Sequence, residues 1–76
     1  MTWEELCGKA KEMGLFVSED NSMEPAYIRF GNLLFTQQGQ IILSDTAYDL
    51  DLCCVNHLVR NDRTPKQMWQ IMEALR

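Results

Sequence analysis

Three β-rich runs, separated by turn-forming residues, occupy the middle of the chain and constrain its fold more than any other feature. These runs are residues 27–30, 33–36 and 40–43. Gly31 and Asn32 connect the first two runs, and a glycine at the first position of a two-residue connection favours a type II′ hairpin. A second turn is expected at residues 37–39, which contain Gly39. The sequence therefore predicts a three-stranded antiparallel meander over residues 26–44.

A helix is predicted ahead of this meander, over residues 3–13. Thr2 and Glu5 fit a capping box, in which the side chain of each residue accepts a hydrogen bond from the backbone N–H of the other. Apolar residues follow at helical spacing, and Gly14 suits the left-handed conformation that ends many helices. Residues 15–17 are interpreted as a short extended segment.

The segment from residue 46 to residue 60 has two interpretations. Its apolar residues and its histidine recur at the spacing of a helix face, at Leu50, Cys53, Cys54, His57 and Leu58. Residues 49–52 instead alternate between acidic and apolar side chains, which is typical of a strand. We predict a helix over residues 46–60, because this segment contains neither glycine nor proline, and a strand is the alternative.

A last helix is predicted over residues 65–75. Thr64 is a suitable N-cap, and Pro65 then takes the first helical position, where its missing N–H costs no hydrogen bond. The stripe expected to face the core consists of Met68, Ile71, Met72 and Leu75.

These elements together predict an α+β fold. An N-terminal helix precedes a three-stranded antiparallel β-meander, and two C-terminal helices pack on one face of the sheet, in the order α-β-β-β-α-α. A chain of 76 residues buries only about 60 to 65% of its unfolded surface and cannot divide that surface between two cores. We therefore expect residues 1–76 to form a single small globular domain.

The sequence is typical of a cytoplasmic protein. Its first residues are acidic and lack the basic region and the apolar stretch of a secretory signal peptide. Its apolar runs are far shorter than the roughly 20 residues of a membrane span. The three cysteines are an odd number, and a disulfide between the adjacent Cys53 and Cys54 is strained. We predict reduced thiols without a disulfide, and no membrane contact.

Charge is distributed unevenly along this acidic chain, whose net charge is −4. Residues 1–56 contain nine acidic and three basic residues, whereas residues 57–76 contain four basic and two acidic ones. The basic C-terminal part is suited to face either an acidic partner or the protein's own acidic half. Of these two interpretations we favour the second.

Cys53, Cys54 and His57 bring two of the three thiols and the only imidazole within five residues. On a helix, Cys53 and His57 share a face and Asp49 extends the same row, as metal ligands often do. A structural zinc site needs four ligands, however, and only the distant Cys7 remains to complete a thiolate-rich shell. We interpret these residues as core packing and predict no metal and no cofactor; a metal-binding or Cys/His-dependent protein is the alternative.

Catalysis by Cys53 and His57 is disfavoured. A nucleophilic cysteine needs a base and an orienting group, and these usually converge from separate elements at a pocket. One row of a helix does not supply that geometry, and a domain of this size has little volume left for a pocket. The sequence therefore predicts no catalytic residues and a non-enzymatic protein.

Arg60, Arg63 and Lys66 lie at the start of the last predicted helix. The element order helix, three antiparallel strands, helix resembles that of double-stranded-RNA-binding domains over most of the chain. The resemblance implies a nucleic-acid surface at these bases, although the helix at residues 46–60 departs from the family's order and no lysine-rich cluster opens the last helix. Because an acidic chain neutralises few phosphates, nucleic-acid binding is an alternative, and solvation of a turn is the simpler interpretation.

Aromatic and methionine side chains are abundant for so short a chain, and an interface is one use for those that the core does not cover. We predict a protein-binding or self-associating surface that involves the last helix and the exposed side of the sheet, with Trp69, Arg60, Arg63 and Lys66 as its partner-binding residues. The competing interpretation is that the apolar side chains simply complete the core. The function expected is that of a small interaction or regulatory protein, and nothing in the sequence identifies a small-molecule ligand.

Overall fold

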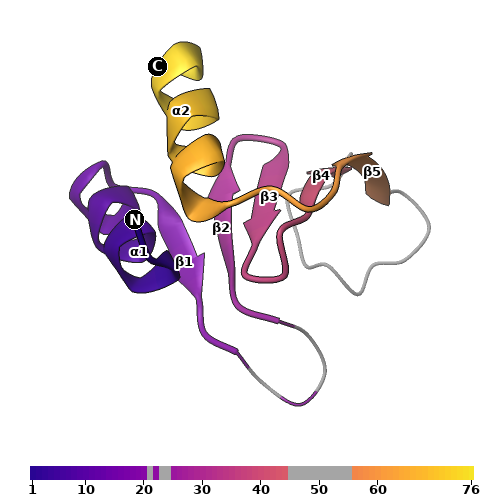
Figure 1. Cartoon of the computed structure of the whole chain (residues 1–76), viewed down its shortest axis with the longest axis horizontal. Coiled ribbons are helices and arrows are strands. Elements are labelled where there is room, and N and C mark those ends of the chain that lie inside the picture. Colours follow the sequence, from indigo (N-terminus) through magenta and orange to yellow (C-terminus); the bar gives the residue numbers. More distant parts are fainter. Residues whose placement is uncertain (21, 23–24, 45–55) are drawn as a thin grey trace.

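The computed structural model describes residues 1–20, 22, 25–44 and 56–76. Within these residues it has an α+β fold, in which five antiparallel strands form one sheet in the order β1-β2-β3-β4-β5 (Figure 1). The elements are α1 Trp3–Glu12, β1 Phe16–Ser18, β2 Tyr27–Phe30, β3 Leu33–Thr36, β4 Ile41–Ser44, β5 Asn56–Arg60 and α2 Pro65–Leu75. The predicted α+β class is confirmed, whereas the predicted order of elements after the third strand is wrong.

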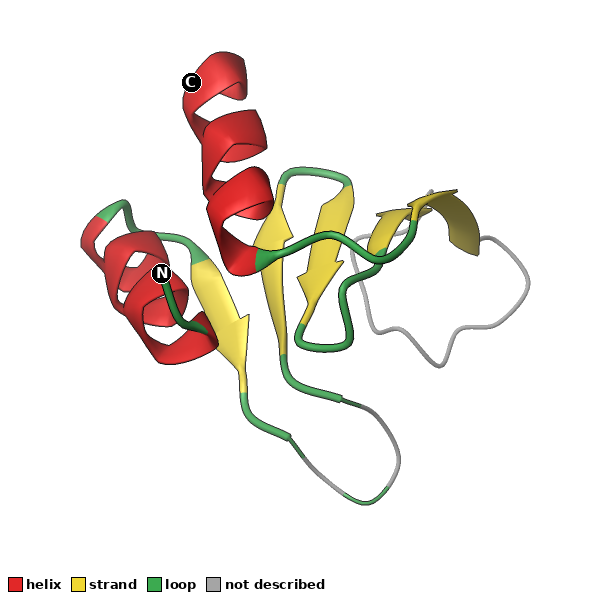
Figure 2. Cartoon of the chain, in the orientation of Figure 1, coloured by secondary structure: helices red, strands yellow, loops and turns green. Residues whose placement is uncertain are grey.

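The core lies between the two helices and one face of the sheet. Ile28 pairs with Phe35, and Phe35 with Ile41, so that the three side chains share a face of the sheet. α1 lies next to both β1 and α2 (Figure 2). The buried core cluster draws on α1, α2 and the strands β2, β3 and β4, and consists of Leu6, Ala10, Ile28, Phe35, Ile41, Met68 and Met72.

The two helices begin with the same capping motif. At α1, the Glu5 backbone N–H donates to Thr2 Oγ1 over 3.2 Å, and the Thr2 N–H donates to the Glu5 carboxylate over 3.0 Å. At α2, Thr64 is the N-cap and Pro65 takes the first helical position. Both helix starts are therefore confirmed, and Gln67 completes a second capping box that the sequence analysis did not identify.

Glycines occupy the two predicted turns of the meander. Gly31, between β2 and β3, has φ +60°, and Gly39, between β3 and β4, has φ +91°. A Cβ added to Gly39 lies only 3.0 Å from the backbone oxygen of Arg63, and the Arg63 N–H donates to the Gly39 oxygen over 2.9 Å. This close approach requires glycine at position 39. The hydrogen bond connects the turn to the loop that leads into α2.

The sheet is larger than predicted at both edges. The extended segment expected at residues 15–17 becomes the edge strand β1, in which Phe16 pairs with Arg29. At the other edge, β5 pairs with β4, with Leu58 opposite Ile42 and His57 opposite Leu43. The three-stranded meander was therefore an underestimate, because whether a short segment becomes a strand depends on the partner it meets.

The prediction of a helix over residues 46–60 is wrong for its last five residues, which form β5. Residues 45–55 lie outside the described residues. A single helix, α2, follows the sheet in the described chain, so the prediction of two C-terminal helices is also wrong. Helical spacing of apolar side chains was outweighed by main-chain pairing, since β5 provides partners for the N–H and C=O groups along β4.

No helix in the described part of the chain has the length and apolar character that a membrane span requires. Among the same residues, Cys7 is a free thiol and no disulfide is present. Cys53 and Cys54 lie outside the described residues.

Candidate functional site

The fold separates the four residues predicted to contact a partner. Arg60 and Arg63 line one groove beside α2, whereas Trp69 is half-buried and packs against the core. The Lys9 ammonium lies 5.0 Å from the centre of the Trp69 ring, a cation–π contact between α1 and α2. Lys66 is exposed on the first turn of α2 and does not line the groove. The structure thus brings two of the four predicted residues together.

The groove along α2 has a volume of about 370 Å³ and is called the arginine groove below. Its lining residues are Arg60, Arg63, Gln67, Gln70, Ile71 and Ala74. The last four of these lie at i, i+3, i+4 and i+7 and therefore form one row along the helix. None of the six lining residues is acidic, so the groove is positively charged.

The turn between β5 and α2 places the two arginines on the same groove. Asp62 adopts a left-handed conformation with φ +57°, and its N–H donates to the Asn61 side-chain oxygen over 2.9 Å. Aspartate and asparagine are the residues that tolerate such a turn best after glycine. The hydrogen bond from the Arg63 N–H to the Gly39 oxygen then fixes the chain just before α2. The sequence signal for this geometry is the Asn-Asp pair.

Local hydrogen bonds hold the polar groups of the groove. Arg60 Nη1 donates to the backbone oxygen of Val59 over 2.8 Å, which uses one of the five N–H donors of its guanidinium. The Gln67 Oε1 accepts from the Thr64 N–H over 2.9 Å, so the Gln67 amide group retains its own N–H donors. A guanidinium is a positively charged group with several N–H donors, and an amide is a neutral donor and acceptor. The groove is therefore suited to binding a ligand that carries negatively charged hydrogen-bond acceptors.

An apolar strip accompanies these polar groups. Ile71 is partly buried against the core, and Leu75, one helical turn later, is 51% exposed. Val59, next to Arg60 in β5, is 40% exposed. The sequence analysis assigned Ile71 and Leu75 to the core stripe and did not include the glutamines. The signal that identifies the groove is the row of Gln67, Gln70, Ile71 and Ala74 on a helix that directly follows two arginines.

The cysteine and histidine cluster falls mostly outside the described residues, which exclude Asp49, Cys53 and Cys54. Its histidine, His57, belongs to β5. The helical row that was expected to align Cys53 with His57 does not extend to His57, because that residue belongs to a strand. Core packing and metal binding by these residues both stay predictions.

The chain matches no protein-family model, no curated protein and no solved structure. Its function is therefore inferred from its own geometry and chemistry.

Proposed function

We propose that this chain is a non-enzymatic cytoplasmic protein that binds a partner protein through the arginine groove. The segment that fits this groove is acidic and partly apolar. Its carboxylates pair with Arg60 and Arg63, and its apolar side chains cover Ile71 and Ala74. The observation that carries the proposal is the convergence of two arginines, from β5 and from the turn before α2, beside an apolar strip of α2.

The charges at the start of α2 support a role in binding. The N-terminus of a helix is the positive end of its dipole and favours carboxylates, which α1 supplies with Glu4 and Glu5 in its first turn. The first turn of α2 contains no acidic residue and instead carries Lys66, with Arg63 just before it. A base in such a position costs about 0.3–1 kcal/mol of helix stability at low ionic strength. Binding of an acidic segment accounts for bases at this position, whereas helix stability disfavours them.

An NMR titration tests the proposal with a defined probe. The probe is a helical peptide with glutamates on one face and leucines beside them, and the control peptide has glutamine in place of every glutamate. We expect the acidic peptide to shift the backbone amide signals of Arg60, Arg63 and Ile71, and the control peptide to leave them nearly unchanged. Equal shifts with both peptides, or shifts spread over the whole surface, would contradict the proposal.

A matched pair of variants locates the effect in the groove. Arg63→Gln should weaken binding of the acidic peptide about three- to tenfold, as expected for the loss of a charged hydrogen-bonding group. Arg76→Gln removes the same charge from the other end of α2, outside the groove, and should change the affinity by less than about twofold. If both variants lose affinity equally, net charge rather than the groove determines binding.

Nucleic acid is the second candidate ligand, because the structure brings Arg60 and Arg63 together and Lys66 follows within one turn. Titration of duplex RNA and of the acidic peptide at rising salt separates the two ligands, since RNA affinity falls more steeply with ionic strength as the number of phosphate contacts grows, whereas the peptide forms only two carboxylate pairs beside its apolar contacts. Tight RNA binding at physiological salt that is lost in Arg63→Gln and Lys66→Gln would replace the protein partner with nucleic acid.

Two further outcomes would change the proposal. Sedimentation that reveals a dimer in the native protein and a monomer in Arg63→Gln would identify a second copy of the chain as the partner. Enzymatic turnover that disappears in Cys53→Ser or in His57→Ala would contradict a non-enzymatic role.

A further inference from the structure

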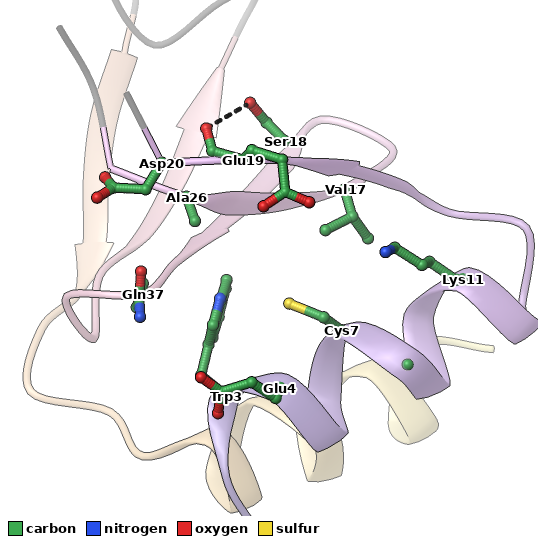
Figure 3. Close-up of a pocket in the computed structure, with 11 residues that line it drawn as sticks. Trp3, Glu4, Cys7, Lys11, Val17, Ser18, Glu19, Asp20, Ala26 and Gln37 are labelled. Carbon is green, nitrogen blue, oxygen red and sulfur yellow. Dashed lines mark hydrogen bonds between the residues drawn. The ribbon is translucent and has the colours of Figure 1, made fainter. Parts of the chain in front are cut away.

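A second concavity lies between α1 and the sheet, away from the arginine groove. It has a volume of about 470 Å³ and is called the acidic cleft below (Figure 3). The residues of its lining that matter to its chemistry are Trp3, Glu4, Cys7, Glu19, Asp20 and Gln37. Its volume lies in the lower part of the range of about 300–1,000 Å³ that is typical of ligand pockets. It shares no lining residue with the arginine groove.

The cleft is lined by one aromatic ring, that of Trp3. Trp3 is half-buried and packs against the core cluster, while its indole also lines the cleft (Figure 3). Packing on one side restricts the rotation of the ring, which lowers the entropic cost of ordering it against a ligand. The face of an indole attracts cations more strongly than any other aromatic side chain does.

Carboxylates from two separate elements surround the same space. Glu4 belongs to the first turn of α1, and Glu19 and Asp20 follow directly after β1 (Figure 3). These three acids share the lining with a single basic side chain, Lys11. The cleft therefore has an excess of negative charge beside an aromatic surface, a combination that suits a cation.

Cys7 also lines the cleft, and the same charges affect the pKa of its thiol. Burial is the main cause that raises the pKa of the Cys7 thiol, and the carboxylates of Glu19 and Glu4 raise it further, while Lys11 acts in the opposite direction. The thiol is consequently neutral at physiological pH and contributes a polarizable, uncharged surface.

We propose that the acidic cleft binds the guanidinium or ammonium group of an arginine or lysine side chain presented by a partner protein. The cation lies against the face of Trp3 and is neutralised by Glu4, Glu19 and Asp20, while the Gln37 amide oxygen accepts one of its N–H groups. This site is separate from the arginine groove, so either proposal can fail without the other.

Two capped amino acids of the same shape test this assignment. The probes are N-acetyl-arginine amide and N-acetyl-citrulline amide, in which an uncharged urea replaces the guanidinium. We expect the arginine probe to shift the Trp3 indole N–H and the Cys7 backbone amide in NMR spectra, and the citrulline probe to bind at least about threefold more weakly. Equal binding of both probes would overturn the proposal, because it would show that the cleft does not recognise charge.

Free arginine distinguishes a protein side chain from a small metabolite. Its α-ammonium and α-carboxylate carry opposite charges, on which the acids of the cleft act in opposite directions, so we expect free arginine to bind no more tightly than the capped probe. Binding of free arginine clearly tighter than that of the capped probe would overturn the assignment to a partner's side chain.

Variants that remove one charge each complete the test. Glu19→Gln should weaken binding of the arginine probe about two- to fivefold, whereas Glu12→Gln, at an exposed position at the end of α1 that does not line the cleft, should leave the affinity unchanged. Arg63→Gln should also leave it unchanged. An equal loss in Glu19→Gln and Glu12→Gln would overturn the proposal, because net charge would then account for binding.

Discussion

The starts of the two helices share a capping motif and differ in charge. Thr2 with Glu5 and Thr64 with Gln67 form equivalent capping boxes. α1 begins with acidic residues that its dipole favours, whereas the first turn of α2 has none and is flanked by bases. The comparison teaches that the cap fixes where each helix begins and leaves the surrounding charge free to vary. The acidic cleft lies beside the start of α1, and the arginine groove lies beside the start of α2.

The core beneath both helices should show the largest effect, because it supports the cleft and the groove alike. Met72 is fully buried in the cluster that also contains residues of α1 and the sheet. Met72→Ala should lower the free energy of unfolding by about 2–5 kcal/mol, measured by urea denaturation. The exposed neighbour Glu73 gives the control variant Glu73→Ala. A loss no greater than that of the control would contradict a common core.

A substitution in the β3–β4 turn should affect the arginine groove more than the acidic cleft. Gly39→Ala forces a side chain into a left-handed conformation within 3.0 Å of the Arg63 backbone oxygen. We expect it to cost about 1–3 kcal/mol in urea denaturation and to weaken peptide binding at the arginine groove. The cleft includes only Gln37 from this turn, so its affinity for the arginine probe should fall less.

Gly8→Ala is the control for this turn. Gly8 lies inside α1 and has nothing within 4 Å of an added Cβ, so the substitution should stabilise the protein by about 0.5–1 kcal/mol. A Gly39→Ala protein as stable as the unmodified chain would show that the contact with Arg63 does not constrain the turn.

Charge removal near the helix starts should have opposite effects on stability. Lys66→Gln removes an unfavourable charge from α2 and should raise the free energy of unfolding by about 0.3–1 kcal/mol, whereas Glu4→Gln removes a favourable one and should lower it by a similar amount. Urea denaturation at low salt measures both changes, and high salt should reduce them. Changes of the same sign in the two variants would refute the electrostatic contrast between the helices.

The smallest expected difference is a pH dependence confined to the cap of α1. Hydrogen bonds from the Thr2 backbone and hydroxyl lower the pKa of Glu5 below its ordinary value of 4.5. A carboxyl whose pKa falls on folding stabilises the folded state above the pKa of the unfolded chain, and this contribution is lost as pH falls through the folded pKa. The cap of α2 uses Gln67, which does not titrate.

An NMR pH titration of the Thr2 and Thr64 amide signals checks this contrast. The Thr2 signal should move as pH falls below 4.5, and the Thr64 signal should stay in place. In Glu5→Gln both signals should be insensitive to pH. A Thr64 signal that moves together with Thr2 would mean that acid acts on the whole fold rather than on one cap.

Sequence reasoning succeeded where the signal was contained in a few neighbouring residues. The capping box of Thr2 and Glu5, the Thr64-Pro65 start and the turns at Gly31 and Gly39 all depend on local backbone geometry. It identified an extended segment at residues 15–17 without predicting that this segment joins the sheet, and it failed for β5, because a short segment becomes a strand only when another strand supplies its hydrogen-bond partners.

The candidate sites were predictable to a similar degree. Arg60 and Arg63 were identified from their charge and position, but the neighbours that complete the groove depend on how α2 packs. The acidic cleft was not predicted at all, since Trp3, Glu19 and Gln37 come from three separate parts of the chain and meet only in the folded structure.

The sequence alone therefore determined where both helices begin, where the meander turns, and which end of the chain is basic. Only the tertiary structure decided how many strands join the sheet, that residues 56–60 extend it instead of forming a helix, and which charged side chains share a cavity. The physical reason is the range of the forces involved. Caps and turns are satisfied by atoms within a few residues, whereas strand pairing and cavity lining need atoms that are distant along the chain.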